Sequence, residues 1–187
     1  MSNGPETDGT VGRNTVAVVA GALVVAWAAS IDTGLSWLLF SAVLGCTLLA
    51  LGWIDWCTLR LPDALTMPLI AIGLLAAWLG QPGAFYSGVI GAACGYGALV
   101  AIGLGYWCLR GHDGLGRGDA KLLAAGGAWL GWAALPTVVL LAALLGLIVA
   151  LAQCARGEKL TSQTMIPFGP PLALAIWLIW IYGLPFD

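Results

Sequence analysis

Long apolar runs separated by short polar breaks dominate the sequence. Apolar stretches of about 17 to 25 residues can cross a bilayer as helices. The pattern predicts seven such spans, two of them short, at 15–29, 35–54, 64–79, 85–109, 120–135, 137–153 and 168–184. Glycine, proline and charge mark the breaks, and Pro136 is expected to separate the fifth span from the sixth. We therefore expect an all-α, polytopic membrane helix bundle.

Composition supports this interpretation and excludes two classes of protein. Of the 187 residues, 60% are hydrophobic and 9% are charged, whereas a soluble domain carries about 25% charged residues. A net charge of −2 without a basic cluster argues against nucleic acid as a partner, because binding phosphates requires grouped Lys and Arg. The five cysteines form no C-x-x-C pair and are expected to be buried thiols, and His112 is the single histidine, so we predict no metal site.

The positions of the basic residues predict the orientation in the membrane. Short loops rich in Lys and Arg stay in the cytoplasm. With seven spans and a cytoplasmic N-terminus, all seven basic residues fall on the cytoplasmic side: Arg13, Arg60, Arg110, Arg117, Lys121, Arg156 and Lys159. Residues 1–14 lack a basic n-region and a small-residue cleavage site, so we expect a polar cytoplasmic tail, and not a removed signal peptide, before one membrane-embedded domain at 15–187.

Two acids at the ends of predicted spans are the strongest candidates for chemistry. Burying a charge in hydrocarbon costs several kcal/mol, so Asp55 at the end of the second span and Asp119 at the start of the fifth call for an explanation. Helix capping is the alternative for Asp119, and it is also what we expect of Asp63 at the third span. The glycine-rich loop 111–118 lacks the Gly-Lys-Ser/Thr ending of a phosphate loop, which argues against a nucleotide. Its glycines would instead let an extended substrate backbone approach Asp119 closely.

Three motifs carry a resemblance to the type IV prepilin peptidases, membrane aspartyl proteases of the GxGD kind. The first motif is matched by Asp55, Pro62, Asp63, Thr66, Pro68 and Leu69. The second is matched by Gly114, Gly116, Gly118, Asp119, Lys121, Leu122 and Leu123, followed by 127–132. A third match covers Ile166, Pro167, Phe168, Gly169 and Pro170. The resemblance spans about residues 35–184 and places all three motifs at the predicted cytoplasmic edge.

The resemblance implies an aspartic endopeptidase without cofactor or metal, whose catalytic residues are Asp55 and Asp119. It implies that the substrate is held by Gly114, Gly116, Gly118, Lys121, Asp63, Pro167, Phe168 and Gly169. That substrate would be a type IV prepilin or a type II secretion pseudopilin, a single-span protein cut after a Gly at the cytoplasmic face of the bacterial inner membrane. Pilus or secretion machinery is a possible partner. Many members carry a front segment with two C-x-x-C pairs linked to zinc and N-methylation; this sequence contains no such pair, so methyl transfer is not implied.

Two carboxylates that share one proton can supply a base and an acid. Helix ends predict an ionised Asp119, at a helix N-terminus, and a protonated Asp55, at a helix C-terminus.

Two other functions stay open at this point. A small transporter or channel would use Asp55 and Asp119 along an ion path, but transport acids usually lie near the bilayer midplane, where none of the seven spans has one. A non-catalytic assembly protein of a pilus or secretion machine would need neither acid, and both are retained within full motifs.

Overall fold

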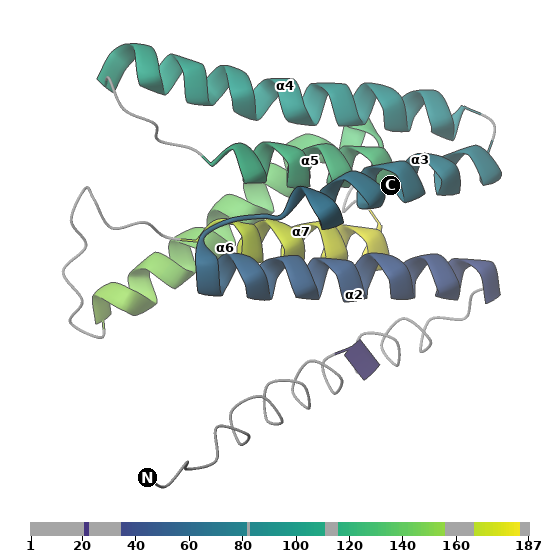
Figure 1. Ribbon diagram of the computed structural model, residues 1–187, viewed down its shortest axis with the longest axis horizontal. Helices are drawn as coiled ribbons and strands as arrows, with labels where there is room; N and C mark the ends of the chain where they lie inside the picture. The colour runs from purple at the N-terminus through teal and green to yellow at the C-terminus, as the bar shows by residue number, and fades with distance from the viewer. Residues whose placement is uncertain (1–20, 23–34, 82, 111–115, 156–166, 184–187) are drawn as a thin grey trace, which may run out of the picture.

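The computed structural model describes residues 21–22, 35–81, 83–110, 116–155 and 167–183, and within these ranges it contains helices and no strands. The elements, labelled as in Figure 1, are α2 (Leu35–Thr58), α3 (Asp63–Leu79), α4 (Ala84–Arg110), α5 (Arg117–Leu130), the short 3-10 helix η1 (Trp132–Ala134), α6 (Leu135–Ala155) and α7 (Gly169–Tyr182). This confirms an all-α bundle. The tail 1–14 and most of the first predicted span, 15–29, lie outside the described residues, so the count of seven stays a prediction.

Three of these helical segments are long and apolar enough to cross a membrane: Trp37–Thr58, Ala84–Leu109 and Trp132–Ala155. Helices α3 and α7 are shorter apolar helices, and α5 belongs to neither group.

The boundary between the fifth and sixth predicted spans was wrong. Pro136 does not break the chain there, because a proline in the first turn of a helix loses no intrahelical hydrogen bond. Instead α5 ends at Leu130, and Gly131 turns the chain with a φ of 81° that favours glycine. The second span also runs one turn further than predicted, to Thr58, so Asp55 lies inside α2.

Helix α5 lies at the centre of the bundle and contacts α3, α4, α6 and α7 (Figure 1). Its contact with α4 is unusually close, because a Cβ at Gly91 would overlap the carbonyl oxygen of Gly127, and a Cβ at Gly127 would overlap that of Gly91. Paired glycines let two helix backbones approach in this way. On the other side, α2 packs along α7, which also contacts α5 and α6.

An aromatic cluster joins these layers. The indole of Trp129 in α5 fills a notch at Gly73, where a Cβ would overlap the ring, and its Nε1 donates a hydrogen bond of 2.9 Å to the Leu69 carbonyl of α3. Its ring also meets Trp180 of α7 edge to face at 5.4 Å between centroids. The Trp180 Nε1 donates to Ser41 Oγ of α2 at 2.8 Å, so one cluster ties α2, α3, α5 and α7 together.

Successive helices alternate in direction, which brings the end of α2 and the starts of α3, α5 and α7 to one end of the bundle, at the left in Figure 1. This end therefore gathers Asp55, Asp119 and the third motif at the start of α7. Arg60 lies between α2 and α3, and Arg117 and Lys121 lie near the start of α5, so these basic residues belong to the same end.

Candidate active site

Asp55 is held by the first residue of α7. Its side chain is buried near the end of α2, and Oδ2 accepts a hydrogen bond of 2.9 Å from the Gly169 N–H. A helix N-terminus offers N–H groups without intrahelical partners, but the two residues after Gly169 are prolines, which have no N–H. Glycine is also required by space, because a Cβ at position 169 would lie 2.5 Å from Asp55 Oδ2. The start of α7 therefore orients this carboxylate.

Asp119 is buried in the first turn of α5. It is not the helix cap that the sequence suggested as the alternative: the N-cap is Gly116, whose carbonyl accepts a hydrogen bond of 3.1 Å from the Asp119 N–H. Asp63 likewise follows the N-cap of α3, which is Pro62. The physical reason is that Pro62, directly before Asp63, and Gly116, three residues before Asp119, have the extended backbone of a cap residue, so each acid lies inside the first turn of its helix.

The two carboxyl groups interact electrostatically. Asp119 lies outside the three long spans. Its pKa is raised to about 7, mainly because the side chain is buried and in addition because the charge of Asp55 is near. A neighbouring like charge disfavours ionisation of a carboxyl group. Burial and the charge of Asp55 thus raise the pKa of Asp119. The helix N-terminus, on which the prediction of an ionised Asp119 was based, acts in the opposite direction. At neutral pH this acid can hold or release a proton.

The first turn of α5 is also fixed from the side of α3. A Cβ at Gly118 would lie 2.8 Å from the Leu61 Cβ, so the turn between α2 and α3 packs directly on the turn that carries Asp119. Two residues later, Lys121 Nζ forms an ion pair of 2.5 Å with Asp63 Oδ1 at the start of α3. These contacts connect the chain after Asp55 with the helix that bears Asp119.

The structure therefore places most of the predicted site residues at the same end of the bundle. Several of those predicted to hold the substrate contact other residues of this chain. Gly118 allows packing on Leu61, Lys121 pairs with Asp63, and Gly169 binds Asp55. Pro167 and Phe168 are half-buried just before α7, and Gly114 lies outside the described residues. Leu61 was missed by the sequence reasoning; its place beside Pro62 in the first motif was the available signal.

Metal binding has no support in the part of the chain that the structure describes, since no three His, Cys, Asp or Glu residues there are grouped to hold an ion. The prediction of buried thiols was wrong, because all five cysteines are exposed. The outer surface of a membrane bundle is apolar, so a thiol is tolerated there as well as in the core.

The model of a family described as "Type IV leader peptidase family" matches residues 42–151. Among curated relatives, each named "Prepilin leader peptidase/N-methyltransferase", that of Aeromonas salmonicida is 41% identical over 166 residues, which is 89% of this chain and 54% of the relative.

Two further relatives have the same name. That of Burkholderia pseudomallei is 46% identical over 139 residues (74% of this chain, 45% of the relative), and that of Neisseria gonorrhoeae is 39% identical over 158 residues (83% and 52%). The chain thus spans about half the length of these relatives. No solved structure matches significantly.

Proposed function

This chain belongs to the type IV leader peptidase family, and from that premise we propose that it is a membrane aspartic endopeptidase that removes the basic leader of type IV prepilins or type II secretion pseudopilins. The observation that carries the proposal is the pair of buried carboxyl groups, Asp55 and Asp119, at one end of the bundle, where burial and then the charge of Asp55 raise the pKa of Asp119. The proposal covers the peptidase activity alone.

The pair has the chemistry that peptide hydrolysis needs. One ionised carboxylate takes a proton from water as the water oxygen attacks the scissile carbonyl carbon, while the protonated partner gives its proton to the carbonyl oxygen. The carboxyl group that took the water proton then gives a proton to the amide nitrogen, a hydroxyl of the diol returns a proton to the other carboxylate, and the C–N bond breaks. The Gly169 N–H keeps the Asp55 carboxylate in one orientation during these transfers.

The position of the pair agrees with such a substrate. A prepilin is a single-span helix with its basic leader in the cytoplasm, so its scissile bond lies at the cytoplasmic membrane edge. We place this end of the bundle at the cytoplasmic face of the bacterial inner membrane, because Arg60, Arg117 and Lys121 belong to it. Transport is not favoured, since both acids lie at helix ends and away from the middle of a span.

The test is mass spectrometry of the N-terminus of a prepilin produced in the same membranes. The unmodified protein should yield a product that begins after the leader Gly, and Asp55→Asn and Asp119→Asn should each leave the leader attached. Asp32→Asn is the matched control, because the sequence places that acid between the first two predicted spans, away from the motifs. Cleavage that persists in both site variants would refute the proposal.

A further inference from the structure

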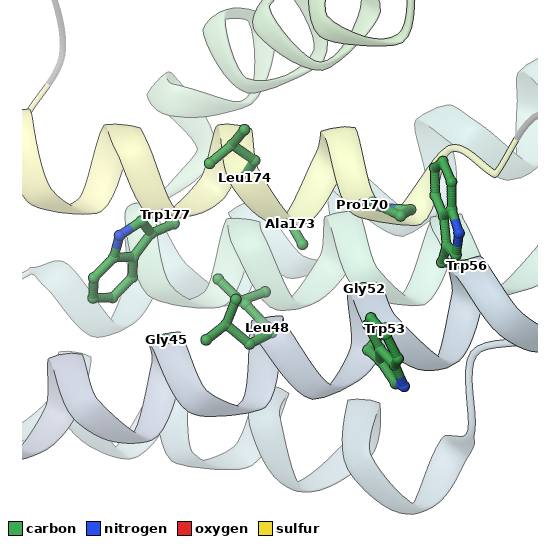
Figure 2. A pocket seen from close by; sticks show the side chains of 10 residues that line it. Gly45, Leu48, Gly52, Trp53, Trp56, Pro170, Ala173, Leu174 and Trp177 are labelled. Carbon is green, nitrogen blue, oxygen red and sulfur yellow. The ribbon is translucent and has the colours of Figure 1, made fainter. Parts of the chain in front are cut away.

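An apolar groove runs along the outside of the bundle between α2 and α7, with a volume of about 340 Å³ (Figure 2). Its α2 side includes Leu49, Gly52, Trp53 and Trp56, and its α7 side includes Pro170 and Leu174. The lining positions of α2 recur from residue 45 to residue 56 on one face, a stretch of about 16 Å. We call this feature the α2–α7 groove.

The α2–α7 groove ends at the candidate site. Trp56 follows Asp55 in the chain, and Pro170 follows Gly169, whose N–H binds the Asp55 carboxylate. The two helices touch at the floor just beside this point, where a Cβ at Gly52 would lie 3.6 Å from the Pro170 Cα. A chain segment lying in the groove would therefore end beside the turn of α2 that carries Asp55 and the first turn of α7.

We propose that the α2–α7 groove binds the apolar helix of the prepilin, in the turns that follow the scissile bond. This proposal rests on the proposed function. The substrate helix lies along α2 with its N-terminal end beside Trp56, so the residues before it leave the helix at the level of Asp55 and reach the carboxyl pair extended.

The shape of the groove favours a helix over a lipid chain as its occupant. Helices associate in membranes where small residues let backbones approach, and Gly52 and Ala173 supply these at the floor. Large side chains border the floor, with Trp53 and Leu174 partly exposed on the two sides. The lining positions recur every three or four residues on both α2 and α7, so one continuous face of each helix forms a wall of the groove.

Photo-crosslinking in membranes tests the proposal. p-Benzoylphenylalanine replaces Trp53 or Leu174 in the groove and, as matched controls, Trp107 or Leu104 on α4; the two tryptophans are 52% and 51% exposed, and both leucines are also exposed. The protein carries Asp119→Asn, so a co-produced, tagged type IV prepilin stays uncut. We expect crosslinks to the prepilin to be about tenfold more abundant from both groove positions than from α4. Equal yields, or crosslinks from the groove to lipid alone, would overturn the proposal.

A second variant measures the consequence for cleavage. Leu174→Trp narrows the groove, so the KM for the whole prepilin should rise about tenfold, while a soluble peptide containing the leader and the first few residues beyond it is cut as before. An unchanged KM for the whole prepilin would contradict docking in the groove.

The two proposals fail in different ways. Cleavage by the unmodified protein without groove crosslinks refutes the groove and leaves the peptidase standing. Groove crosslinks without cleavage refute the peptidase and leave the groove standing, and the absence of both overturns both.

Discussion

Replacing Gly169 by alanine should disable cleavage without unfolding the bundle. The added Cβ would lie 2.5 Å from Oδ2, 2.8 Å from Cγ and 3.0 Å from Cβ of Asp55, whereas ordinary van der Waals contact begins near 3.4 Å. The carboxyl group must therefore retreat by about 0.9 Å. That movement lengthens the 2.9 Å hydrogen bond from the Gly169 N–H beyond a useful range.

The expected loss follows from two independent magnitudes. A hydrogen bond to a charged group contributes about 1.5–3 kcal/mol. Misplacing a catalytic group by about 1 Å costs about 100-fold in rate, which corresponds to about 2.7 kcal/mol. Both lead to a fall in kcat of about 100-fold for Gly169→Ala.

The assay is the initial rate of prepilin cleavage by protein purified in detergent, with the melting temperature measured on the same sample. Gly97→Ala is the control, because a Cβ at Gly97 meets nothing within 4 Å. A Gly169→Ala variant that melts normally and cleaves at the unmodified rate would refute the assignment of Gly169 as the residue that positions Asp55. A variant that only melts earlier would assign it a purely structural role.

Other features of the bundle give three further expectations. Because Asp63 is 63% exposed in its ion pair with Lys121, Lys121→Met should reduce stability by only about 0–1 kcal/mol in thermal denaturation, and the exchange Asp63→Lys with Lys121→Asp should recover it. Burial and its neighbouring carboxylate raise the pKa of Asp119 to about 7, so the shared proton is lost above that pH and the cleavage rate should fall on the alkaline side; a rate that rises steadily from about pH 6 to about pH 9 would contradict this. Gly127→Val would force a side chain into the backbone of α4 and should cost about 3 kcal/mol or more, whereas Gly97→Ala, inside α4 and in open space, should not lower the melting temperature.

The long helices could be predicted from the sequence because a membrane span is encoded in the length and hydropathy of one continuous run. The end of α5 could not, because it depends on the backbone of Gly131, one of 27 glycines, and hydropathy does not distinguish a glycine with positive φ from one inside a helix. Pro136 was misread as a break for a related reason. Proline is found both where a helix ends and in the first turn of a helix, and the sequence alone does not distinguish the two positions.

The carboxyl pair could also be predicted, because an acid beside hydrocarbon stands out in an apolar sequence. What holds Asp55 could not be predicted from the residues alone. Its partner is a backbone N–H, which every residue except proline has, so the role of Gly169 becomes visible only when α7 lies against α2. The α2–α7 groove is hidden in the same way, since its apolar lining does not differ in composition from any lipid-facing surface.

The shortness of α5 has a consequence for how this protein is made. Its 14 residues rise about 21 Å, against a hydrocarbon core of about 30 Å, and it is neither one of the long spans nor one of the shorter apolar helices. Such a segment is a poor substrate for membrane insertion by itself. We expect it to enter the bilayer with α4 as a helical hairpin, joined by the backbone contact between Gly91 and Gly127. That contact would then decide, during synthesis, whether Asp119 is delivered to the membrane at all.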